Sequence, residues 1–252
     1  MPDNPIEQNS PLAGARSGAW FALAYVGIVL GVDLLATAGA SWPFDWRFFV
    51  WRPAGLADLI ENAGLSPSFY TWLAWQPLRN FDVFKFTFWF LVPFLICLWH
   101  MDWGALGTRR WKKMDLWLLG ALFVFGIAGV VLVQFIPSLR AEFPSQSNLP
   151  GSNKWMIFWV ALFWNLSWVP GWEFMHRYFL LRRLDAQWLK YGWVLVPIIE
   201  VAYHYRDVYM AAGMGLFAVI ATIWARERRN ILLPFIAHFF IEIALVLFLL
   251  FV

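Results

Sequence analysis

The final stretch of the chain, from Asn230 to Val252, reads NILLPFIAHFFIEIALVLFLLFV and decides the class of fold. It is long enough to cross a bilayer as a helix, since one span needs about 20 apolar residues. Its ionisable side chains, His238 and Glu242, are four positions apart, so a helix places them on one face. An ionisable side chain is costly inside a membrane unless it is paired or hydrated. The pair therefore indicates a functional site.

Composition extends this interpretation to the whole chain. Of its 252 residues, 61% are hydrophobic and 14% are charged, with 19 Trp and 25 Phe. Soluble domains carry about 25% charged residues. The net charge of +3 is too small to indicate a nucleic-acid partner. The sequence therefore predicts an integral membrane protein whose surroundings are the lipid bilayer.

Apolar windows of spanning length recur along the chain. We predict an all-α, polytopic transmembrane bundle of about seven spans, near residues 19–38, 84–101, 115–137, 155–181, 191–205, 207–225 and 230–252. The fourth window is interrupted by Val169-Pro170-Gly171, which predicts a kink.

The remaining segments complete one membrane domain. Residues 1–18 are polar and predict a disordered N-terminus. Residues 19–153 hold the N-terminal membrane helices, and within them residues 41–83 predict an amphipathic interfacial cap rich in Trp and Phe. Residues 154–252 form a predicted helical core, which contains the polar stretches described below. The lone Cys97 lies in an apolar run, and we assign it no role.

Basic residues gather in three loops, which follow the second, fourth and sixth windows: Arg109 to Lys113, Arg182-Arg183 with Lys190, and Arg226 to Arg229. In a seven-span chain all three lie on one side, which the positive-inside rule makes cytoplasmic. We expect a cytoplasmic N-terminus and location in a bacterial inner membrane.

Acids and imidazoles recur in three stretches of the predicted core, namely WEFMHR (172–177), EVAYH (200–204) and HFFIE (238–242). Counted from the basic loops at about 1.5 Å per helical residue, these side chains lie about 12 to 21 Å deep. Unrelated ion pairs need not share one level, so we expect the three stretches to form one site.

Two kinds of chemistry fit these residue types. A carboxylate beside a neutral imidazole activates water as a general base, while another imidazole donates a hydrogen bond to a developing oxyanion. Alternatively, the imidazoles and carboxylates hold a divalent metal. Because the H-E-x-x-H signature is absent, the metal is the weaker alternative, and we expect no cofactor.

The three stretches, in this order and spacing, resemble those of the CPBP (CAAX protease and bacteriocin-processing) intramembrane endopeptidases, which include type II CAAX prenyl endopeptidases. The family pattern is E-E-x-x-x-R, then F-x-x-x-H, then H-x-x-x-N or H-x-x-x-D. The resemblance covers residues 155–245 and implies glutamic-type hydrolysis without metal. This chain departs from the pattern at Trp172, at Glu200 and at Glu242.

The resemblance implies roles for individual residues. Glu173 is expected to be the general base, His204 its partner and His238 the oxyanion donor. Arg177 would orient Glu173, while Glu200 and Glu242 would support the imidazoles or replace the missing first Glu of the pattern.

The predicted substrate is a membrane-anchored or lipidated protein. Two other functions remain open: a non-catalytic scaffold or immunity protein, favoured by Trp172, and a metal-binding or ion-coupled transporter.

Overall fold

The computed structural model describes residues 18–38, 82–99, 112–143, 145, 147–188, 190–204 and 207–252, and the statements below concern these residues. They form helices, without a strand among them: α2 (Ala19–Ala38), α6 (Val83–Lys85), η2 (Phe86–Leu91), α7 (Val92–Trp99), α8 (Lys113–Val133), α9 (Pro137–Glu142), α10 (Gly151–Glu173), η3 (Phe174–Leu180), α11 (Leu181–Trp188), η4 (Gly192–Val194), α12 (Leu195–Tyr203), α13 (Val208–Arg228) and α14 (Leu232–Phe251). The predicted N-terminal tail, except Gly18, and nearly all of the predicted cap lie outside the described residues.

Each of the seven predicted windows contains helix, which confirms the all-α class. Within the described residues, three helices are long and apolar enough to cross a membrane, namely α8, α13 and α14. The chain is therefore a membrane protein by the length and composition of these helices. The other apolar helices are shorter, and the described residues do not establish the predicted count of seven spans.

The fourth window is helical through its predicted kink, without a break. Helix α10 runs through Val169-Pro170-Gly171 and continues into the π-helical segment η3. Gly171 serves packing between helices: a Cβ atom there would lie 2.8 Å from Cβ of Trp89 and 3.1 Å from the backbone nitrogen of Phe90. Since a helix backbone cannot easily move aside, η2 comes close to α10 because residue 171 is a glycine.

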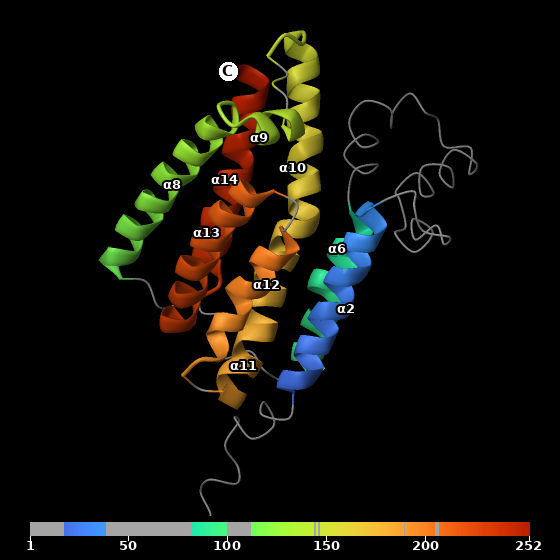
Figure 1. The fold of residues 1–252 in the computed structure, drawn as a ribbon, viewed down its shortest axis with the longest axis vertical. Helices are drawn as coiled ribbons and strands as arrows, with labels where there is room; N and C mark the ends of the chain where they lie inside the picture. Colours follow the sequence, from blue (N-terminus) through green and yellow to red (C-terminus); the bar gives the residue numbers. More distant parts are fainter. Residues whose placement is uncertain are drawn as a thin grey trace, which may run out of the picture.

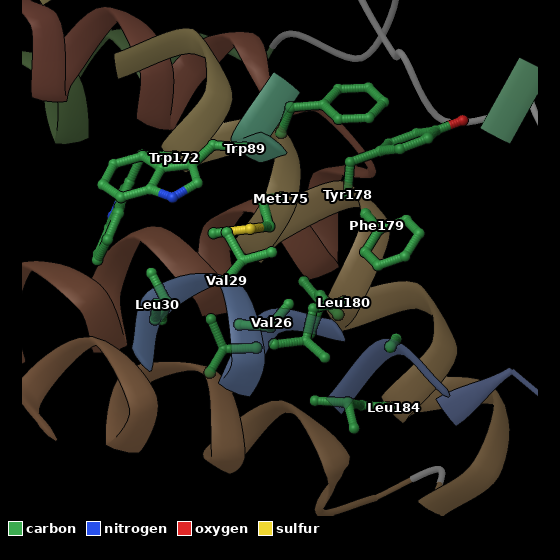
Figure 2. Close-up of a cluster of buried hydrophobic side chains, with 14 of the residues drawn as sticks. Val26, Val29, Leu30, Trp89, Trp172, Met175, Tyr178, Phe179, Leu180 and Leu184 are labelled. Atoms are coloured by element: carbon green, nitrogen blue, oxygen red, sulfur yellow. The ribbon is translucent and has the colours of Figure 1, made fainter. Parts of the chain in front are cut away.

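Buried side chains form two apolar clusters. In Figure 2, the first cluster brings together α2, η2 and η3, with Trp89 and Trp172 among its largest members. The second joins α8, α13 and α14 around Leu122, Trp224 and Leu233. Helix α10 packs against both η2 and α14. It thus passes between the two clusters, and its C-terminal end carries Glu173.

Helices α8, α11 and α13 meet through charged side chains at one end of the bundle, the basic end, where α8 begins and α13 ends (Figure 1). Arg228, in the last turn of α13, pairs with Asp115, in the first turn of α8, at 2.8 Å. Arg226 pairs with Asp185 of α11, also at 2.8 Å. These ion pairs hold α8, α11 and α13 together at this end.

Candidate functional site: a buried carboxylate and imidazole network

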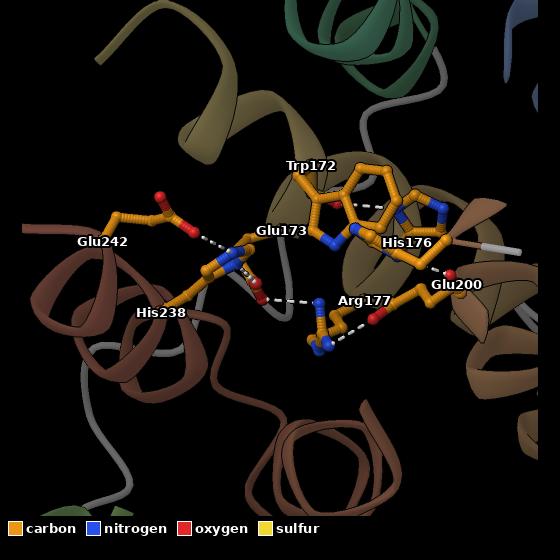
Figure 3. Close-up of polar contacts among 8 residues, drawn as sticks. Trp172, Glu173, His176, Arg177, Glu200, His238 and Glu242 are labelled. Carbon is orange, nitrogen blue, oxygen red and sulfur yellow. Dashed lines mark hydrogen bonds and ion pairs between the residues drawn. The ribbon is translucent and has the colours of Figure 1, made fainter. Parts of the chain in front are cut away.

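Four elements, the consecutive α10 and η3 together with α12 and α14, bring the site together (Figure 3). Glu173 ends α10, and Arg177 follows in η3. Glu200 comes from α12, while His238 and Glu242 come from α14. The predicted convergence of the three polar stretches is therefore present, although His204 makes different contacts, described below.

A π-helical turn positions the first two residues. In a π-helix each N–H bonds one residue further back than in an α-helix, which leaves the neighbouring carbonyl in need of a donor. His176 supplies one, because its Nδ1 donates to the carbonyl oxygen of Trp172 at 2.9 Å. A carbonyl oxygen can only accept, so this contact fixes the proton on Nδ1. His176 thus stabilises the irregular turn that carries Glu173 and Arg177.

Arg177 joins two carboxylates from different helices. Its Nη1 lies 2.8 Å from Oε2 of Glu173, and its Nη2 lies 2.9 Å from Oε2 of Glu200. The guanidinium also lies over the ring of Phe217, 5.5 Å from its centroid. The contact with Glu200 is an ionic hydrogen bond, a kind about twice as strong as a neutral one, whereas the contact with Glu173 is an ion pair. The expected contact from Arg177 to Glu173 is therefore present, and Glu200 is an additional partner that the sequence did not reveal.

His238 is the imidazole that meets Glu173. Its Nδ1 lies 2.6 Å from Oε1 of Glu173. The imidazole packs against Trp168 and Phe217, with ring centroids 5.4 and 5.3 Å away. Its other nitrogen, Nε2, lies 3.8 Å from Oε1 of Glu242. The predicted face shared by His238 and Glu242 thus joins the network, although this last distance is too long for a hydrogen bond.

Burial differs along the network. Glu173, Arg177, Glu200 and His238 are each at most 2% exposed. The side chain of Glu242 is 21% exposed, which makes it the most accessible member of this group. Charges this deeply buried are tolerated when they are paired, as they are here.

His204 makes its hydrogen bond within its own helix. Its Nδ1 donates to the backbone carbonyl of its own helix, at Glu200, over 2.8 Å. The ring lies 5.9 Å from that of Trp172, which also packs on His176 and Tyr203. The expected pairing of Glu173 with His204 is thus replaced by pairing with His238. The indole of Trp172 occupies the neighbourhood of His204, where the family pattern has a carboxylate.

A second polar group, which the sequence did not predict, lies beside the first. The hydroxyl of Tyr203 donates to Asp33 of α2. Lys85 lies 3.9 Å from Asp33 and 3.8 Å from Asp82. Because Tyr203 precedes His204, these contacts tie α2 and α6 to the helix that carries Glu200. The signal for this group in the sequence was Asp33, an isolated acidic residue in the first predicted span.

The described residues were compared with the donor sets that bind metal ions. No group of three or more His, Cys, Asp or Glu side chains there has an arrangement suited to a metal ion. Between Glu173 and Glu200, the position of a bridging cation is taken by the guanidinium of Arg177.

Comparisons of the chain with protein-family models, with curated proteins and with solved structures found no match.

Proposed function

We propose that this chain is a membrane-embedded endopeptidase in which a glutamate and a histidine activate water. The contact between Oε1 of Glu173 and Nδ1 of His238, 2.6 Å long and buried, carries the proposal. A carboxylate that binds one nitrogen of an imidazole fixes its tautomer and stabilises its protonated form. This arrangement suits proton transfer to and from a reacting group.

The geometry favours roles that differ from those implied by the family resemblance. An ionised carboxylate accepts hydrogen bonds, so the proton lies on Nδ1 and the neutral ring has its lone pair on Nε2. Nε2 is buried and has no hydrogen-bond partner among the described residues. We therefore assign the general base to His238 and the orienting role to Glu173, whose other oxygen is held by Arg177.

The proposed reaction balances without a cofactor. A water molecule attacks the carbonyl carbon of the scissile peptide bond and gives a proton to Nε2 of His238. The C–N bond then breaks, and the same proton passes from Nε2 to the leaving amine. Glu173 keeps its negative charge and stabilises the imidazolium while the proton resides there.

The surroundings suggest the substrate class. The reacting nitrogen lies among helices of a membrane protein, with Trp168 and Phe217 beside it. A membrane-anchored or lipidated protein segment reaches such a position more readily than a soluble one. The proposal includes the seven-span bundle, a cytoplasmic N-terminus, a bacterial inner membrane and membership of the CPBP-like group, supported by the motif order and the basic loops.

One observation favours a second candidate function, a non-catalytic scaffold or immunity protein. Trp172 is 1% exposed, and its ring packs on His176 and His204. In such a protein, the ion network serves folding alone. The two candidate functions predict different results for variants that remove the charge of Glu173 or the base His238 but still fold: the endopeptidase loses cleavage, whereas the scaffold has no cleavage to lose.

Glu173→Gln and His238→Gln test this difference, with Arg140→Gln on exposed α9 as control. Terminal peptides are compared between membranes of cells that produce each variant. We expect protein fragments present with wild type and the control to be lost with both site variants, while all four proteins remain folded. Identical fragments in all four samples would refute the endopeptidase and favour the scaffold.

A further inference from the structure

We infer that Glu200 is a positioning residue, which acts through Arg177 to hold the carboxylate of Glu173 against His238. The inference rests on the proposed function for its catalytic meaning, but its first test needs no substrate. The family pattern has Phe at this position, and the roles expected for Glu200 from the sequence, supporting the imidazoles or replacing the missing first Glu, did not include a contact with Arg177.

The two terminal nitrogens of Arg177 have separate partners. Nη1 contacts Glu173, one turn before it, at 2.8 Å, whereas Nη2 contacts Glu200 of another helix at 2.9 Å. All three side chains are at most 1% exposed. A guanidinium is planar, so contacts at both ends fix the orientation of the plane. With Glu173 as its single partner, the plane is free to turn about the remaining contact.

The orientation of the guanidinium determines that of Glu173. Arg177 binds Oε2 of this carboxylate, and His238 binds Oε1. A carboxyl group is rigid and planar, so a rotation that moves Oε2 also moves Oε1 away from Nδ1. Glu200, on α12, thus fixes the contact between Glu173 and His238 without being part of that contact.

Glu200 also changes the charge that His238 experiences. In the ionised form, Glu173 and Arg177 alone are neutral together, whereas two carboxylates and one guanidinium carry a net charge of −1. A positive imidazolium beside this trio is stabilised more than one beside the neutral pair. Both effects support proton transfer at Nε2 and weaken when Glu200 becomes neutral.

The spectroscopic test uses the four His of the chain, labelled with nitrogen-15 in detergent-solubilised protein. We compare wild type, Glu200→Gln, Arg177→Gln and the double variant. A short hydrogen bond from Nδ1 to a carboxylate gives a strongly downfield proton signal. Glu200→Gln is expected to shift or broaden the signal of His238, while the signal of His176, bound to a backbone carbonyl, stays in place.

The double variant separates positioning from a general structural role. If Glu200 positions Glu173 through Arg177, then Glu200→Gln has a much smaller effect on His238 once Arg177 is Gln, because only the direct effect of its charge remains. Asp185→Asn is the matched control, since it breaks an ion pair of 2.8 Å at the basic end of the bundle. An unchanged His238 signal in Glu200→Gln, or equal effects of this change with and without Arg177, would overturn the inference. If Glu200→Gln does not fold, the His238 signal of Arg177→Gln is compared with that of the double variant, which lacks one positive and one negative charge. This comparison then decides the test.

Kinetics then connects positioning to the reaction. The rate of peptide-bond hydrolysis in a solubilised membrane extract is measured for the same variants. We expect kcat to fall roughly 10- to 100-fold in Glu200→Gln, with KM nearly unchanged, because misplacement of a reacting group costs about that much. A changed His238 signal with an unchanged rate overturns the catalytic meaning of the inference. Absence of hydrolysis by wild type counts against the proposed function and leaves the spectroscopic result intact.

Discussion

Glu173 and His238 are 65 residues apart in the chain, and their side chains meet at 2.6 Å between α10 and α14. This contact joins the helix that packs on both apolar clusters to the last helix of the chain. On its far side Arg177 connects it to α12, so three helices depend on one run of alternating charges. Loss of single members therefore has predictable consequences for stability as well as for chemistry.

Arg177→Met is expected to destabilise the protein by about 3–5 kcal/mol, because it leaves two buried carboxylates without their cation. Arg177→Met combined with Glu200→Leu is expected to recover most of that loss, since a buried pair replaced by apolar side chains is often neutral. Thermal unfolding in detergent, followed by circular dichroism, checks both. A double variant less stable than Arg177→Met contradicts the pairing.

Gly171→Ala is expected to destabilise the protein by about 1–3 kcal/mol, because the new methyl group meets the backbone of η2. Gly129→Ala on α8 is the control, since a Cβ atom there would have no neighbour from another helix within 4 Å. That change is expected to stabilise the helix by about 0.5–1 kcal/mol. Equal unfolding midpoints for the two variants would show that η2 does not approach α10 at residue 171.

The basic end of the bundle is expected to show a pH dependence from Asp185. Burial raises the pKa of this carboxyl above its ordinary value of 3.8, and the guanidinium of Arg226 offsets only part of that rise. Above pH 3.8 the folded chain thus holds a proton that the unfolded chain has released, so stability falls as pH rises through this window.

Asp185→Asn removes this titration, so the difference in unfolding midpoint between wild type and variant isolates it. The raised pKa of Asp185 stabilises the folded wild type most at low pH. We therefore expect the unfolding midpoint of wild type, relative to that of Asp185→Asn, to fall as the pH rises from about 4 towards neutrality. If the midpoint of wild type instead rises relative to that of the variant, then Arg226 lowers the pKa of Asp185 by more than burial raises it.

The length of the apolar runs in the sequence was sufficient to predict the helical windows. The spacing of Glu173 and Arg177 was sufficient to predict their contact, because residues four apart share one face of a helix. Depth counting also brought Glu200, His238 and Glu242 to the same region.

The choice of partner for Glu173 was not predictable in this way. Counted depth places His238, at about 12 Å, nearer to Glu173, at about 13 Å, than His204, at about 21 Å. Whether two such side chains face each other depends further on how α12 and α14 are rotated. His204 is at the end of α12, where its Nδ1 donates to a carbonyl of the last turn. The π-helical turn was missed as well, because no residue pattern in that stretch distinguishes it from an α-helix.

Hydrolysis in heavy-oxygen water tests the central claim most directly. Purified wild type and His238→Gln are incubated in vesicles with membrane proteins from cells that lack this chain, and new carboxyl termini are read by mass spectrometry. We expect termini that carry heavy oxygen with wild type and none above background with His238→Gln. Labelled termini in equal amounts with both proteins, or with neither, would contradict the claim.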